Sequence, residues 1–197
     1  MNSKRLSLKA LCAGALLACA FVRPGMAAEV SGVRFPDSAT VAGKELVLNG
    51  LGVRTKFIVK VYATGLYLPE KTSSVPDIMK NEGPRKVKIV MMRDLSSDDF
   101  GQAFMAGLNA NLTAPERAKI IGQISKFGEM FALLDMLKKG DMMDLDYVPG
   151  SGTTCYLNGK RIGEVAPDVA FYNAILSIWI GAAPADTSLK PKLLGLK

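Results

Sequence analysis

Three side chains in one apolar stretch have the chemistry to hold an anionic or phenolic ligand. The stretch runs from Asn49 to Pro69, and its alternating pattern predicts a strand with Arg54, Lys60 and Tyr62 on the polar side. A guanidinium offers two parallel donors to a carboxylate, and a phenol or an ammonium adds further donors. The stretch is therefore either the wall of a ligand pocket or a half-solvated strand with no further role.

The composition excludes several kinds of active site. The chain of 197 residues contains no histidine, which excludes Ser-His-Asp and Cys-His sites and removes the commonest zinc ligand. The glycine-rich motifs of nucleotide-binding and hydrolase sites are also absent. Asp141, Asp144 and Asp146 are interpreted as a solvated strand face, and Cys155 as a buried, unreactive thiol. We therefore expect no metal and no cofactor.

The first 28 residues have the pattern of a secretory signal peptide. A basic start precedes the apolar run Ala10–Val22, which is shorter than the roughly 20 residues of a membrane span. We predict a secreted, periplasmic protein with a single mature domain at 29–197; a lipoprotein anchored through Cys19 is the alternative. The segment carries four of the chain's cations and no acid, so its removal takes the net charge from +7 to about +3, which does not favour nucleic-acid binding. These cations are Lys4, Arg5, Lys9 and Arg23.

The rest of the chain predicts strands on both sides of a helical block. Helices are expected from Ser96, from Thr113 to Lys139 and from Pro167 to Ile180, followed by an irregular tail at 182–197. The strand patterns lie at 33–36, 45–48, 53–68 (one strand, or two joined by a bend), 86–92, 142–148, 153–157 and 160–165. This order predicts an α+β domain with a mainly antiparallel sheet backed by helices.

The glycine-rich turn and strand at 49–68, NGLGVRTKFIVKVYATGLYL, resemble the signature of the chalcone isomerase family. The preceding GVRFP and the ending Ile178–Gly181 of the last helix match that family more weakly. The resemblance implies an open-faced β-sandwich, in which helices back a large antiparallel sheet and a ligand cleft lies between them. The family has two functional branches, one catalytic and one that binds fatty acids, and the resemblance implies that this chain is similar to one of them.

The residues match the catalytic branch poorly. Plant chalcone isomerases use five polar residues, and Arg54 corresponds to the first of them. Tyr62 stands at the strand threonine, and the helix tyrosine falls at about Phe100. The helix asparagine falls near Gly107, with Asn109 two residues away and off register, and the late threonine has no clear counterpart near Gly163.

The fatty-acid-binding branch keeps the arginine and has a tyrosine where the isomerases have threonine, so the resemblance implies that Arg54 and Tyr62 hold a carboxylate. The two are eight residues apart, roughly 26 Å along a straight strand. They converge only if the chain bends near Gly50 and Gly52 or a bulge lies near Thr55 and Lys56; otherwise Lys60 replaces one of them.

The sequence therefore favours a secreted domain that binds a small amphipathic carboxylate, such as a fatty acid, or a phenolic ligand in an apolar cleft. An isomerase of the intramolecular lyase type is the first alternative, and a non-catalytic partner-binding module is the second. The oligomeric state stays open.

Overall fold

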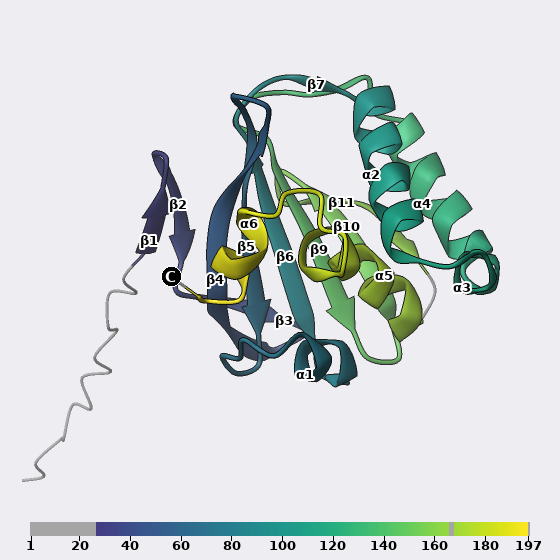
Figure 1. Ribbon diagram of the computed structural model, residues 1–197, viewed down its shortest axis with the longest axis horizontal. Coiled ribbons are helices and arrows are strands. Elements are labelled where there is room, and N and C mark those ends of the chain that lie inside the picture. Colours follow the sequence, from purple (N-terminus) through teal and green to yellow (C-terminus); the bar gives the residue numbers. More distant parts are fainter. Residues whose placement is uncertain (1–26, 166–167, 197) are drawn as a thin grey trace, which may run out of the picture.

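The protein is built around one curled antiparallel sheet. The computed structural model describes residues 27–165 and 168–196, and seven strands form the sheet in the order β11-β10-β9-β6-β5-β4-β3 (Figure 1). The strands are β1 (Ala27–Val30), β2 (Val33–Pro36), β3 (Ser38–Val41), β4 (Lys44–Lys56), β5 (Val59–Leu68), β6 (Arg85–Met91), β7 (Leu95–Ser96), β8 (Met136–Leu137), β9 (Met142–Val148), β10 (Gly152–Leu157) and β11 (Lys160–Val165). The helices are α1 (Val75–Lys80), α2 (Ser97–Asn111), α3 (Ala114–Lys119), α4 (Ile121–Ala132), α5 (Val169–Ile180) and α6 (Leu189–Leu193).

The sheet has a hydrophobic core on each face. The larger core lies under α2, α4 and α5, where alternate sheet residues such as Leu66 and Ile89 meet the helices. The smaller core lies on the other face under the β1–β2 hairpin, where Tyr67 packs with Phe35. This arrangement confirms the predicted α+β class with an antiparallel sheet backed by helices.

The stretch 53–68 is divided between two strands of a tight hairpin. Lys56 pairs with Val59 across a turn formed by Phe57 and Ile58. The chain therefore reverses at the turn instead of bending near Gly50 and Gly52, and β4 and β5 lie side by side in the sheet.

The helical block ends earlier than the sequence predicted. The Thr113 cap is confirmed, since its side chain and Glu116 form a reciprocal capping box. The expected helix is interrupted at Ile120 and ends at Ala132. The chain then adds a short strand in which Leu137, fully buried, pairs with Leu95, so the prediction that Lys139 ends the helix was wrong.

The C-terminal tail, expected to be irregular, contains α6, which packs on β4. Gly50 and Gly52 make this close approach possible. A Cβ on Gly50 would collide with the carbonyl oxygens of Lys192 and Leu193, and one on Gly52 would lie 2.6 Å from a methyl of Leu189. The sequence suggested a chain bend at these two glycines; their role in the structure is to leave room for α6 to pack directly on β4.

The N-terminal prediction falls mainly outside the described residues. Positions 1–26 of the expected signal peptide lie there, while Ala27 and Ala28 begin β1 and pair with Pro36 and Phe35. Among the helices of 27–165 and 168–196, none has the length and apolar character that crossing a bilayer requires.

Candidate functional site

The hairpin brings Arg54 and Tyr62 together. They are direct partners in the β4–β5 register, and the Arg54 guanidinium carbon lies 5.7 Å from the centre of the Tyr62 ring. The register shifts just after Arg54, so Val61 is the additional residue on β5. The turn therefore brings together two residues that would be far apart on one straight strand. The bulge that the sequence allowed near Thr55 shifts the β4–β5 register by one residue.

Tyr62 is held in a defined orientation by Trp179 of α5. The indole Nε1 donates a 2.7 Å hydrogen bond to the phenol oxygen, and both side chains are buried. Burial raises the pKa of Tyr62 to about 12, in opposition to the charge of Arg54 and to this hydrogen bond. The phenol is therefore neutral at physiological pH. Because its oxygen accepts from the indole, its own hydrogen is available for a ligand oxygen.

Lys60 does not join this pair. Its ammonium is exposed and donates to the Ser31 hydroxyl in the β1–β2 turn, 3.0 Å away. Neither of the two cavities that adjoin Arg54 includes Lys60 in its lining. The geometry therefore supports the Arg54–Tyr62 pair and not the replacement of one partner by Lys60.

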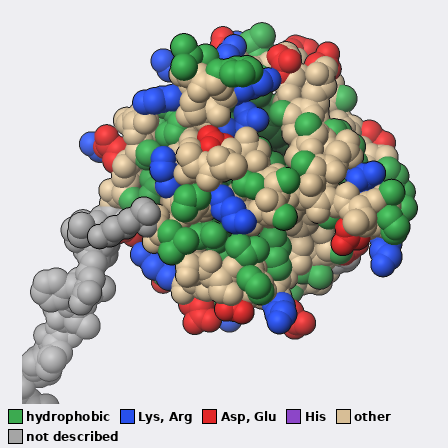
Figure 2. All heavy atoms as spheres, in the orientation of Figure 1, with side chains coloured by type: hydrophobic (Ala, Val, Ile, Leu, Met, Phe, Trp, Pro, Cys, Tyr) green, Lys and Arg blue, Asp and Glu red, His purple; other side chains and the backbone are tan. Residues whose placement is uncertain are grey.

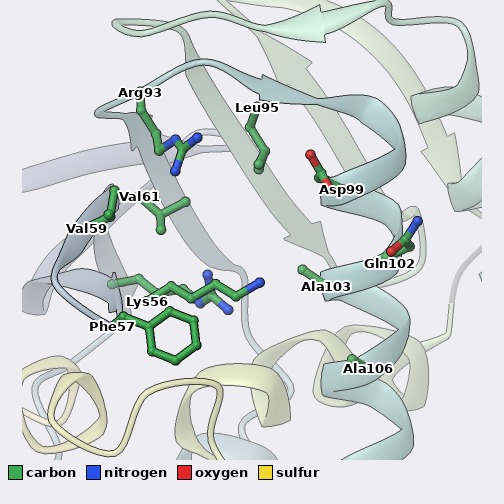
Figure 3. A pocket seen from close by; sticks show the side chains of 11 residues that line it. Lys56, Phe57, Val59, Val61, Arg93, Leu95, Asp99, Gln102, Ala103 and Ala106 are labelled. Carbon is green, nitrogen blue, oxygen red and sulfur yellow. The ribbon is translucent and has the colours of Figure 1, made fainter.

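An open cleft of ≈ 520 Å³ lies next to Arg54, between the hairpin and α2. Figure 3 shows Lys56 and Phe57 on the hairpin side and Asp99 and Gln102 on α2 across the cleft, with Arg93 extending into the cleft from the segment after β6. The cleft contains three cations, since Lys56 and Arg93 add to Arg54. One carboxylate, that of Asp99, accepts a hydrogen bond from the Ser96 hydroxyl. The positive excess favours an anionic ligand.

A small apolar cavity lies behind the cleft. It measures ≈ 40 Å³, and Arg54, Leu95 and Ala103 line both spaces. The other side chains around the small cavity are mostly aromatic or aliphatic, and Tyr62 and Trp179 are the polar exceptions. These side chains are Tyr62, Phe100, Phe104, Phe127, Leu145, Ile178, Trp179 and Ala185.

A layer of phenylalanines separates the small cavity from a third space between α2 and α4. This outer groove of ≈ 400 Å³ is also lined by Phe100, Phe104 and Phe127. The rings stack closely, with 4.5 Å between the centres of Phe104 and Phe127 and 4.7 Å between those of Phe100 and Phe131. Arg54 therefore lies at the boundary between the open polar cleft and the small apolar cavity, which phenylalanine side chains separate from the groove between α2 and α4.

Three of the five positions compared with the catalytic branch carry no polar side chain in this structure. Phe100 is buried against Phe131. Gly107 lies against α5, and a Cβ there would come within 2.8 Å of Ile178. A side chain at Gly163 would collide with Met130. The site thus lacks hydroxyl and amide donors at these three positions.

Sequence reasoning missed four residues of chemical interest: Lys56, Arg93, Trp179 and Arg85. The first two line the cleft, and Trp179 reaches Tyr62 from a helix 117 residues away in the sequence, so no local pattern indicated the contact. Arg85 is fully buried. A signal for it existed, because Arg85 continues the inward alternation of Val87, Ile89 and Met91 on β6.

The interpretation of Asp144 and Asp146 as a solvated strand face was wrong: Asp146 is buried, and both residues form ion pairs on the face of the sheet opposite the helices. Lys86 lies 3.4 Å from Asp144 and 3.2 Å from Asp146, and Lys88 lies 3.3 Å from Asp144. Within 27–165 and 168–196, no three His, Cys, Asp or Glu side chains are grouped as metal ligands would be.

The sequence matches the model of a family described as chalcone isomerase-like over residues 27–195. The chain therefore belongs to the chalcone isomerase-like family, as its signature at 49–68 indicated. The fold resembles the crystal structure of a fatty-acid binding protein from Arabidopsis thaliana with a TM-score of 0.67 and 17% sequence identity. The similarity covers 86% of this chain and 96% of that one. No curated protein matches the sequence.

Proposed function

We propose that this protein binds a small amphipathic carboxylate, such as a fatty acid, with its head group at Arg54 and Tyr62. The observation that carries the proposal is the position of Arg54, directly opposite Tyr62 at the boundary between a cationic cleft and an apolar interior. The family membership and the fatty-acid binding of the structural neighbour support it.

The head-group chemistry fits a carboxylate. The ion pairs found in the described part of the chain leave Arg54 without a carboxylate partner, so its guanidinium can accept a ligand in two-pronged geometry. The neutral Tyr62 phenol supplies one more donor from the same side, held in place by Trp179. Lys56 and Arg93, both exposed, raise the local concentration of anions at the mouth of the cleft.

The apolar tail requires movement of the phenylalanine layer. A cavity of ≈ 40 Å³ is far below the roughly 300–1,000 Å³ of ligand pockets. Rotation of Phe100 and Phe104 would join this cavity to the ≈ 400 Å³ groove between α2 and α4. The tail would then run from Arg54 beneath α2, with the carboxylate still at the cleft. The binding of longer chains therefore depends on these rings.

A binding role fits the site better than isomerase chemistry. Ring closure by the catalytic branch needs donors around a ketone, and Phe100, Gly107 and Gly163 stand where three polar residues would be. We propose, from the signal-like pattern at 1–28, that this binding takes place in the periplasm.

Native mass spectrometry of the protein purified from cells tests the proposal, together with displacement of a fluorescent fatty acid. We expect a co-purified carboxylic acid, and we expect Arg54→Ala to weaken binding by tenfold or more, because a hydrogen-bonded charge contributes about 1.5–3 kcal/mol. Lys60→Ala is the matched control, since it removes a cation from the same hairpin outside the cleft. Equal affinity in the two variants would overturn the head-group assignment, and turnover of a chalcone by an empty protein would overturn the binding role.

A further inference from the structure

The tip of the β4–β5 hairpin exposes three consecutive apolar residues. Phe57 is 92% exposed, Ile58 94% and Val59 41%. Figure 2 shows hydrophobic side chains gathered at the top of the molecule, where Figure 1 places this tip. Single exposed hydrophobic residues are ordinary, but an adjacent aromatic and aliphatic pair at a projecting turn indicates an interaction surface.

The turn itself does not account for these residue types. Phe57 has a φ of +57°, in the left-handed region where glycine and asparagine cost least. The β10–β11 turn of the same sheet uses Asn158 and Gly159 at such positions. Backbone geometry alone would favour similar residues at the β4–β5 tip. The turn geometry therefore does not explain an aromatic side chain at Phe57.

Cations surround the apolar tip. Lys56 and Lys60 flank it in the sequence Lys-Phe-Ile-Val-Lys, and Arg93 lies across the cleft that Lys56 and Phe57 border (Figure 3). Three acids near the hairpin already have hydrogen-bond partners: Asp186 accepts from the backbone of Thr55, Asp94 from that of Lys139, and Asp99 from the Ser96 hydroxyl. An apolar tip with cations beside it is complementary to an anionic lipid surface, where phosphates cover an acyl interior.

We propose that this hairpin tip docks the protein on anionic phospholipid membranes. Phe57 and Ile58 enter the acyl boundary, while Lys56 and Lys60 contact the lipid phosphates. The inference goes beyond ligand binding and does not depend on it. It also places the cleft mouth at the lipid surface, because Lys56, Phe57 and Val59 belong to both the tip and the cleft.

A tryptophan at the tip gives a local readout of insertion. Trp179, the one tryptophan of the chain, is only 5% exposed, so it supplies a constant background in the full-length variant Phe57→Trp. With vesicles containing phosphatidylglycerol and brominated acyl chains, we expect the emission of the new indole to be quenched and shifted to the blue. Vesicles of brominated phosphatidylcholine alone should produce at least tenfold less binding.

The matched control is Ser151→Trp. Ser151 is exposed in the β9–β10 turn, at the end of the sheet opposite the hairpin tip. Near the tip, Tyr62 pairs with Met91 at the end of β6, and Val90 pairs with Met142 at the start of β9. The β9–β10 turn follows the other end of β9, where Tyr147 pairs with Arg85. Its indole should be unaffected by either vesicle. The control also separates tip insertion from any attachment through another part of the chain, because such attachment would not select the tip indole.

Charge variants complete the test. Lys56→Gln and Lys60→Gln should each weaken vesicle binding by about fivefold at low salt. Ile58→Asp in the Phe57→Trp background should abolish quenching, and an unchanged circular dichroism spectrum should show that the fold is intact. Quenching that persists with Ile58→Asp, equal quenching of the two tryptophan positions, or equal binding to phosphatidylcholine would overturn the proposal. Concentration-dependent dimerisation without vesicle binding would also overturn it, with a second copy as the partner.

Discussion

Two arginines of the central sheet, Arg54 and Arg85, stack on tyrosine rings in very different surroundings. Arg54 lies 5.7 Å from the ring centre of Tyr62 and borders an open cleft. Arg85 lies 4.9 Å from Tyr147 and 5.1 Å from Tyr172, and it is fully buried. The same pairing of cation and phenol thus occurs once at a surface and once in the core.

The contacts of Arg85 are those of a structural link. Its Nη1 donates to the carbonyl of Ile78 in α1 at 2.9 Å and to the side chain of Asn173 in α5 at 2.8 Å. Burial lowers its pKa, while the nearby phenols of Tyr172 and Tyr147 act in the opposite direction. Arg85 therefore joins the start of β6 to two helices. Stacking on tyrosine does not by itself identify a ligand site; access to a cleft does.

Alanine substitutions at the two arginines should lower the free energy of unfolding by very different amounts, and this is the largest difference we expect. Arg85→Ala leaves a cavity and unpaired groups on α1 and α5, and should lower the free energy of unfolding by about 3–5 kcal/mol. Arg54→Ala should lower it by less than about 1 kcal/mol. Urea unfolding followed by circular dichroism measures both.

Arg85→Met is the control for the role of the charge. It keeps much of the volume in a tyrosine-lined site and should cost less than Arg85→Ala, because apolar replacements of buried ions are often tolerated. A loss of less than about 1 kcal/mol in Arg85→Ala would contradict the structural role of Arg85.

The pH dependence of stability should arise on the opposite face of β6, beside Lys86. Burial raises the pKa of Asp146 to about 6, against the attraction of Lys86. The folded state therefore holds the Asp146 proton more tightly than the unfolded state. The resulting stabilisation is complete below the ordinary aspartate pKa of about 4 and is lost as the pH rises through about 6, to a total of at most about 3 kcal/mol.

Three variants test whether the pH dependence of stability comes from Asp146 and not from Arg54 or Arg85. Asp146→Asn should flatten the stability profile between pH 4 and 7, measured by urea unfolding at each pH, while Arg54→Ala and Arg85→Met should retain it. If the profile of Asp146→Asn kept the full slope, the titrating group would lie elsewhere.

The smallest expected effect concerns the phenol of Tyr62. Tyr62→Phe removes the acceptor of the buried Trp179 N–H, and should cost about 1–2 kcal/mol of stability. It should also weaken carboxylate binding severalfold and change the tryptophan emission. Tyr172→Phe removes another buried tyrosine hydroxyl, which donates to the Leu145 carbonyl, and should affect stability alone. Equal loss of binding in both variants would contradict a specific role for Tyr62.

The sequence allowed much of the fold to be predicted because most strand ends carry recognisable turn residues. Asn158 and Gly159 indicated the β10–β11 hairpin, and both have the positive φ angles that such a turn requires. Two strands within 53–68 were one of the alternatives, but the position of the β4–β5 turn was missed because Phe57 and Ile58 continue the apolar pattern of the strands. The helical spacing likewise continues past Ala132, whereas the pairing of Leu137 with Leu95 depends on distant residues.

The candidate site was only partly predictable for the same reason. Arg54 and Tyr62 came from the family signature, but their contact follows from the hairpin turn, and the contact of Tyr62 with Trp179 joins distant parts of the chain. Lys60 was selected because it is two residues from Tyr62 on one strand face. The bulge at Val61 changes that relation and places Lys60 beside Ser31.

The measurement that tests the account most directly is carbon-13 NMR of a bound fatty acid labelled at its carboxyl carbon. If Arg54 holds the carboxylate, the pKa of the bound carboxyl should lie well below the ordinary carboxyl range of about 4–5, because a neighbouring arginine lowers a carboxyl pKa by about 1–3. The carboxyl should then stay ionised at pH values where a free one is protonated. The Arg54→Ala variant should show a carboxyl that titrates in the ordinary range or above it, or no bound signal. A bound carboxyl with the same pKa in the wild-type protein and in Arg54→Ala would contradict the proposal that Arg54 is the head-group site.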